Sequence, residues 1–73
     1  NPTNGIVNIN SLKESINSIK VMDIQGKELA FYDNLNAKMN DIDMASFENG
    51  VYFVKIELAN GTTEVAKIVK TDK

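Results

Sequence analysis

The side chains of this sequence that could take part in chemistry are a few carboxylates. Asp41 and Asp43 lie two residues apart, and Glu57 and Glu64 lie in neighbouring β-rich segments. Such pairs act as general acid and base only inside a pocket that excludes water, and nothing in the surrounding sequence builds one. The chain has no histidine and no cysteine, so its serine and threonine hydroxyls lack the usual base. We therefore expect no enzymatic activity and no cofactor.

Oxygen-bearing side chains also gather at Asn40, Asp41 and Asp43, which raises the question of a calcium site. A calcium loop needs spaced acids and a glycine at its sharp turn, and this run has neither. In a strand, Asp41 and Asp43 would point to the same side and offer too few ligands. We interpret the run as the solvated face of a strand and expect no metal.

Length and charge limit the chain to one small domain, which we expect to span residues 1–73. It carries 8 basic and 10 acidic side chains, for a net charge of −2, so it lacks the basic footprint of a nucleic-acid-binding protein. No apolar run is long enough to cross a bilayer, and no signal peptide is visible. Because Asn1-Pro2 reads like the interior of a longer chain, we expect this domain to be part of a larger protein.

The elements that would position these side chains are organised around a predicted β-hairpin over residues 49–70. Two β-rich runs meet at Asn60-Gly61, which is a strong hairpin signal. In the first run, apolar residues at every second position give one wholly apolar face. These are Tyr52, Val54, Ile56 and Leu58.

The register of this hairpin can be predicted from charge. A two-residue turn would place Glu57 opposite Glu64, and like charges facing each other destabilise paired strands. A three-residue loop over residues 59–61, with Gly61 in the left-handed conformation, shifts the second strand by one residue. We favour that loop, which pairs Tyr52 with Ile68, Phe53 with Lys67, Val54 with Ala66 and Lys55 with Val65.

Four further segments are predicted to be strands, at residues 6–9, 19–24, 27–32 and 37–44. The second has apolar residues on both faces, Ile19 and Val21 on one and Met22 and Ile24 on the other, so we place it in the middle of a sheet. Asp23 is expected to cap the turn that follows, with Gly26 in the left-handed conformation. Residues 1–5 are predicted to form a turn and residues 11–18 a connecting loop.

Short strands separated by regular turns are typical of a sandwich. We predict an all-β fold, a small antiparallel β-sandwich of about six to seven short strands. Phe47 is expected to close one end of its core. The hydroxyl of Tyr52 is expected to reach a backbone group near a strand corner.

Taken together, four blocks of this sequence resemble the C-terminal sorting domains of the type IX secretion system. They are Asn1-Pro2-Thr3-Asn4-Gly5-Ile6-Val7, Ile19-Lys20-Val21-Met22-Asp23-Ile24-Gln25-Gly26-Lys27, the stretch from Ile42 through Gly50 and Tyr52 to Ile56, and Lys67-Ile68-Val69-Lys70. Their order and spacing match the family over essentially the whole chain. In the family, another proline-containing segment often precedes the part that Asn1-Pro2 resembles, and here Thr71-Asp72-Lys73 follow the closing lysines.

This resemblance implies an immunoglobulin-like sandwich at the C-terminus of a cargo protein in Bacteroidetes-type bacteria. It implies a signal that takes cargo from the periplasm across the outer membrane to the cell surface or beyond. The implied partners are an outer-membrane translocon, a shuttle protein and a surface sortase that removes the domain at an upstream site. The motif positions it points to are Pro2, Gly5, Asp23, Gly26, Gly50, Tyr52 and Gly61. Each glycine among them is also explained as a left-handed turn residue.

The closing strand is the candidate recognition segment. Lys67 and Lys70 lie near the end that the family presents to its machinery, and Lys55, if opposite Val65, extends a basic strip. We hypothesise that the machinery reads this strand through its backbone edge and its charges. The candidate residues are Lys55, Lys67, Ile68, Val69 and Lys70. The alternative is that surface lysines only protect a sheet edge from aggregation.

Two other functions are compatible with a small sandwich. A non-catalytic immunoglobulin-like accessory module would bind a glycan or a protein at the cell surface, and it would need an exposed aromatic platform. A purely structural spacer would tolerate changes to its strand lysines without consequence.

Overall fold

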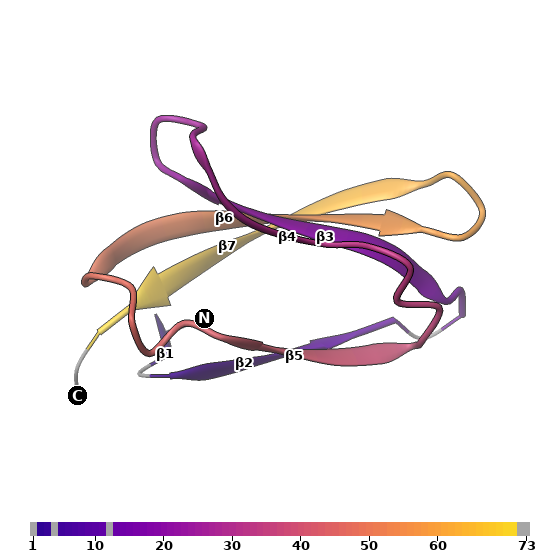
Figure 1. Ribbon diagram of the computed structural model, residues 1–73, viewed down its shortest axis with the longest axis horizontal. Coiled ribbons are helices and arrows are strands. Elements are labelled where there is room, and N and C mark those ends of the chain that lie inside the picture. The colour runs from indigo at the N-terminus through magenta and orange to yellow at the C-terminus, as the bar shows by residue number, and fades with distance from the viewer. Residues whose placement is uncertain (1, 4, 12, 72–73) are drawn as a thin grey trace.

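The computed structural model describes residues 2–3, 5–11 and 13–71, and within them the chain is all-β. The strands are β1 (Pro2–Thr3), β2 (Ile6–Asn10), β3 (Ile16–Asp23), β4 (Glu28–Tyr32), β5 (Met39–Asp43), β6 (Gly50–Leu58) and β7 (Thr63–Lys70). They form two layers with the core between them (Figure 1). The predicted small β-sandwich is confirmed.

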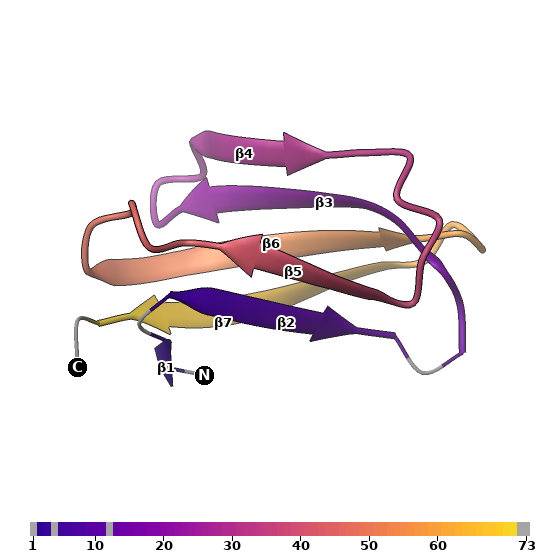
Figure 2. The ribbon, with the colours of Figure 1, turned by 60° about the horizontal axis from the view of Figure 1, so that its bottom comes forward.

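The two layers are unequal in size. One sheet has five strands in the order β1-β7-β6-β3-β4, and the other pairs β2 with β5. Figure 2 shows the small sheet lying across one face of the large one. All neighbouring strands are antiparallel except β1, which runs parallel to the end of β7. β3 lies between β6 and β4, as its two apolar faces predicted.

The core lies between the inward faces of the two sheets. The strict alternation of β6 buries every second side chain, because successive residues of a strand point to opposite faces. The buried apolar residues are Val7, Ile9, Ile16, Ile19, Val21, Ile42, Met44, Tyr52, Val54, Ile56, Leu58 and Ile68. Phe47 packs against this cluster from the turn before β6, in agreement with its expected place at one end.

The hairpin of β6 and β7 has the register predicted from charge. Tyr52 pairs with Ile68, and Glu57 faces Thr63 instead of Glu64. In the loop, the Leu58 N–H donates to the Thr62 carbonyl at 2.8 Å and the Gly61 N–H donates to the Leu58 carbonyl at 3.0 Å. Gly61 has φ of 90°, a conformation that costs a side chain about 1–2 kcal/mol. The three-residue loop is therefore confirmed.

The start of β3 was predicted wrongly. Residues 11–18 were expected to be a loop, but the strand begins at Ile16, whose side chain is completely buried. Ile16 pairs with Leu58 and Ser18 with Glu57, so Asn17 is an extra residue in a β-bulge. The bulge lets Ile16 and Ile19 face the same side although they are three positions apart, a spacing that puts residues of a regular strand on opposite faces. Alternation alone could not reveal a strand with this interruption.

Two other segments also differ from the prediction. Pro2 and Thr3, expected in a turn, form β1 and pair with Val69 and Lys70. Proline cannot donate a hydrogen bond to a neighbouring strand, and it is tolerated in β1 because β1 lies at the edge of the sheet. Ile24 is 70% exposed, because β3 ends at Asp23 and the chain turns at once. The strands predicted over residues 6–9, 27–32 and 37–44 form with ends shifted by one or two residues.

Candidate functional site

The predicted recognition segment is the C-terminal half of β7, and its side chains divide between two faces. Lys67 is exposed and Val69 half-buried on the side turned away from β2 and β5. Ile68 is in the core at 2% exposure, and Lys70 is buried at 3%. Lys70 therefore does not belong to the expected basic surface strip. The same alternation that buries Ile68 directs Lys70 inward.

The backbone edge of β7 is only partly covered. β1 pairs with it at Val69 and Lys70, and over residues 63–68 no other described strand pairs with that edge. The Leu58 N–H to Thr62 carbonyl bond fixes which β7 residues bond to β6, and the alternation then turns the N–H groups of Thr63, Val65 and Lys67 outward. This unpaired edge offers backbone donors and acceptors to an added strand.

The outer face of the five-stranded sheet, which is the face turned away from β2 and β5, carries the other candidate residue, Lys55. One row of directly paired residues crosses all four long strands of this sheet. We call it the lysine row, and it consists of Phe31 on β4, Lys20 on β3, Lys55 on β6 and Val65 on β7. Lys55 faces Val65, as predicted from the hairpin register.

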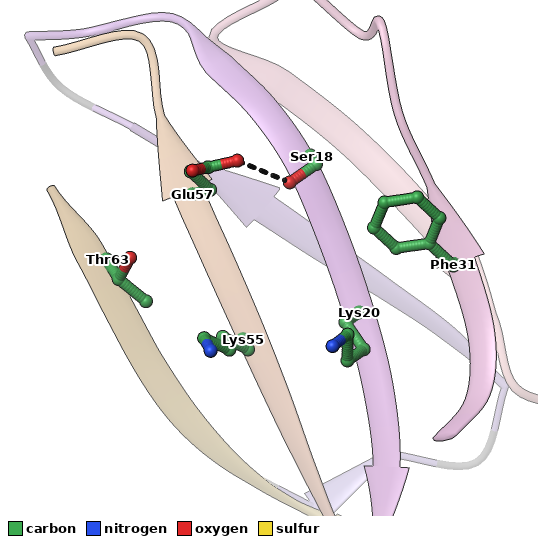
Figure 3. Close-up of a pocket in the computed structure, with 6 residues that line it drawn as sticks. All are labelled: Ser18, Lys20, Phe31, Lys55, Glu57 and Thr63. Carbon is green, nitrogen blue, oxygen red and sulfur yellow. Dashed lines mark hydrogen bonds between the residues drawn. The ribbon is translucent and has the colours of Figure 1, made fainter. Parts of the chain in front are cut away.

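A shallow hollow of about 200 Å³ lies over the middle of the lysine row (Figure 3). Its lining residues are Ser18, Lys20, Phe31, Lys55, Glu57 and Thr63. Figure 3 shows Lys20 and Lys55 side by side on adjacent strands, with Phe31 beyond Lys20 and Thr63 beyond Lys55. Sequence reasoning missed Lys20 and Phe31. The pairing of β3 with β6 brings them beside Lys55, and that pairing spans more than thirty residues of sequence.

The charges of this hollow are incompletely paired. Lys20 Nζ lies 3.8 Å from Glu28 Oε1, a long contact between two solvent-accessible side chains. Ser18 Oγ donates to Glu57 Oε1 at 3.2 Å. Lys55 has no ion pair within the described ranges 2–3, 5–11 and 13–71. Two lysines are thus direct cross-strand partners on the central strands, and like charges in such a pair destabilise a sheet.

Asp23 and Tyr52, two of the motif residues, hold turns together through hydrogen bonds. Asp23 Oδ1 accepts from the backbone N–H groups of Gln25 and Lys27, both at 2.9 Å, which confirms the expected cap. The Tyr52 hydroxyl donates to the Glu48 carbonyl at 2.6 Å, which confirms that it reaches the backbone at the strand corner.

The remaining motif residues lie at strand ends and turns. Gly26 has φ of 86°, the predicted left-handed conformation. Gly50 opens β6 with φ of 157°, a positive backbone angle that residues with a side chain rarely adopt. The Gly5 carbonyl accepts from the Met44 N–H at 3.0 Å, and Pro2 is in β1. The left-handed conformation of Gly5 stays a prediction.

The carboxylates considered for catalysis or metal binding have local partners. Asp41 Oδ1 accepts from Asn8 Nδ2 at 2.6 Å, and Asp43 Oδ1 accepts from the Ala45 N–H at 2.9 Å. Both side chains are exposed on the open face of β5. Over the described ranges, no three acidic side chains converge as they would around a metal ion. The fold therefore uses these carboxylates to hold β2, β5 and the following turn.

Residues 1–71 match the family model described as the secretion system C-terminal sorting domain. No match was found among curated proteins. In the part of the chain that the structure describes, no helix has the length and apolar character needed to cross a membrane.

Proposed function

Because this chain belongs to the family of secretion system C-terminal sorting domains, we propose that it directs an attached cargo protein through the type IX secretion system and is then removed. The sorting role follows from the family, whose model spans residues 1–71. The proposal adds that a surface sortase cleaves upstream of the domain, and that cargo lies on its N-terminal side. The protein then resides in the periplasm during transit and at the cell surface or outside the cell afterwards.

The partly open edge of β7 is the feature that best supports recognition of this domain by the secretion machinery. Over residues 63–68, β7 has no described strand on the side away from β6, so an extended segment of the translocation machinery can pair with it. Lys67 is exposed on this stretch and supplies a charge beside the backbone groups. Because Lys70 is buried and Val69 pairs with β1, the recognition segment that we propose is Thr63–Ile68. Lys67 within it and Lys55 on the neighbouring strand supply its positive charges.

An accessory glycan-binding module is less well supported by the same surface. Phe31 is 50% exposed, whereas Phe53 is half-buried and Tyr52 belongs to the core. The ring pair that the described residues form is Phe47 with Tyr52, at the end of the core with centroids 5.4 Å apart. Stacking a sugar needs an open aromatic platform, and one exposed ring beside lysines is a poor substitute.

A reporter fusion tests the proposed sorting and cleavage together. Residues 1–73 are placed after a fluorescent protein that has its own export signal, and a type IX-competent cell is fractionated and immunoblotted. We expect intact fusion in the periplasm and, outside the outer membrane, a reporter shortened by at least the 8.1 kDa of this domain. Reporter that stays intact and periplasmic contradicts the proposal. Full-length reporter at the surface contradicts cleavage but leaves sorting standing.

A further inference from the structure

The lysine row poses a physical problem that the fold alone does not solve. Lys20 and Lys55 are direct partners on β3 and β6, and facing like charges disfavour strand pairing. Lysines often protect the edges of sheets, but β3 and β6 are both interior strands with neighbours on either side. Edge protection therefore accounts for Lys67 on β7 and not for the Lys20–Lys55 pair.

The composition of the outer face points to what would offset this repulsion. Its three lysines, Lys20, Lys55 and Lys67, exceed its two glutamates, Glu28 and Glu57, so the face is positive although the whole chain has a net charge of −2. Glu57 accepts a hydrogen bond from the Ser18 hydroxyl, and the carboxylate of Glu28 lies 3.8 Å from the ammonium group of Lys20. A carboxylate placed between the two ammonium groups would accept charge-assisted hydrogen bonds from both.

Apolar surface lies at both ends of the row. Phe31 is 50% exposed at one end and Val65 is 61% exposed at the other. If an acidic side chain of a partner bound between the two lysines, the residues on either side of it in the partner could pack against Phe31 and Val65. This arrangement fits a short protein segment in which a carboxylate is flanked by apolar residues.

We propose that the lysine row is a docking site for an Asp or Glu side chain of a partner protein, carried on a segment with apolar flanks. The proposal deepens the proposed function and rests on it, because the partner is then a component of the secretion machinery. It concerns the outer face of the sheet and is separate from pairing at the edge of β7.

Two other anionic occupants fit less well. An anionic bilayer attracts clustered basic residues roughly in proportion to their number, and the glutamates of this face leave it only one net positive charge. A second copy of the chain could offer Asp41 and Asp43 from the open face of β5, but both carboxylates already accept local hydrogen bonds. A free carboxylate from another protein avoids both difficulties.

Paired substitutions in the reporter fusion test this proposal. The test variant is Lys20→Gln with Lys55→Gln, and the matched control is Lys13→Gln with Lys38→Gln, which removes two exposed lysines outside the strands. We expect the test variant to lower the exported fraction about tenfold, the effect of losing a charge-assisted contact, and the control to export like the unmodified fusion. Lys20→Arg with Lys55→Arg retains the charges and should restore export.

Direct binding identifies the ligand chemistry. The purified fusion is passed over an immobilised peptide of alternating valine and glutamate, over its valine–glutamine counterpart, and over phosphatidylglycerol vesicles. We expect saturable, salt-sensitive binding to the glutamate peptide alone, about tenfold weaker for Lys20→Gln with Lys55→Gln. Binding only to vesicles, or self-association of the fusion without peptide binding, would overturn the proposal.

The failure of this inference is distinguishable from failure of the proposed function. If the unmodified fusion is not exported, the sorting role itself is wrong. If the unmodified fusion is exported and the Lys20 and Lys55 variant leaves the cell equally well, the docking site is wrong and the sorting role stands. Melting each variant by circular dichroism separates both outcomes from misfolding, because relieving like-charge repulsion should not lower stability.

Discussion

At the scale of single residues, the turns of this domain are held by specific side-chain contacts to backbone. Tyr52 is the most buried of these anchors, at 7% exposure, and its hydroxyl reaches the Glu48 carbonyl while its ring contacts Phe47. One side chain thereby joins the core to the turn that leads into β6. Such a contact can be predicted from residue chemistry, because a buried phenol needs a polar partner close to the surface.

Replacing Tyr52 with Phe should lower the free energy of unfolding by about 1 kcal/mol, because the ring still packs while the hydrogen bond is lost. Urea denaturation measures this as a lower midpoint with an unchanged slope. Tyr32→Phe is the control. Tyr32 is half-buried on β4, and its hydroxyl has no hydrogen-bond partner within the described residues. Equal losses for the two variants would refute the structural role of the Tyr52 hydroxyl.

The burial of Lys70 could not be predicted from its residue type. A lysine near a chain end is usually exposed, so Lys70 was expected on the surface with Lys67. The structure buries Lys70 because it is on the same face as Ile68, two residues earlier. The predicted register already contained this information, since it placed Ile68 opposite Tyr52 on the inward side. Strand parity outweighed the general preference of lysine for water.

At the scale of elements, hairpin register followed from charge, whereas the start of β3 did not follow from any pattern. The β6–β7 loop could be predicted because one register put Glu57 against Glu64 and the other did not. The bulge at Asn17 interrupts the alternation of β3, so Ile16 does not fit the period-two pattern of the rest of the strand. Local signals therefore define turns well and define interrupted strands poorly.

The open edge of β7 leads to an element-scale prediction. Lys67→Pro removes an N–H that points away from β6, so the β6–β7 ladder survives while the edge loses a donor and gains a ring that obstructs an added strand. In the reporter fusion, we expect export to fall about tenfold relative to Lys67→Ala, which removes the same charge but keeps the N–H. The two variants should unfold within about 1 kcal/mol of each other in urea. Equal export by both would show that the edge is not read.

At the scale of the whole molecule, the sequence predicted the class of fold but not its assembly. The alternation of apolar residues and the turn glycines indicated a small β-sandwich. The division into five and two strands depends on long-range pairings, such as β2 with β5 and β1 with β7. No local pattern specifies these pairings, because they satisfy the buried faces and edges of the complete domain.

The same limit applies to the candidate site. Lys55 and Lys67 could be chosen from the hairpin alone, because both strands of the hairpin are adjacent in sequence. Lys20 and Phe31 enter the site only when β3 and β4 join the sheet beside β6. The positive outer face of a net negative domain is thus a property of the assembled sheet. Composition, which averages over both sheets, gives no sign of it.

The most direct test of the central claim is the share of reporter recovered outside the cell when residues 1–73 are fused to it. The measurement compares otherwise identical cells with and without the type IX translocon, using unfused reporter as the control. We expect reporter to leave the cell only when both the domain and the translocon are present. Fused reporter that remains in the periplasm of translocon-bearing cells, or that leaves cells lacking the translocon, would contradict it.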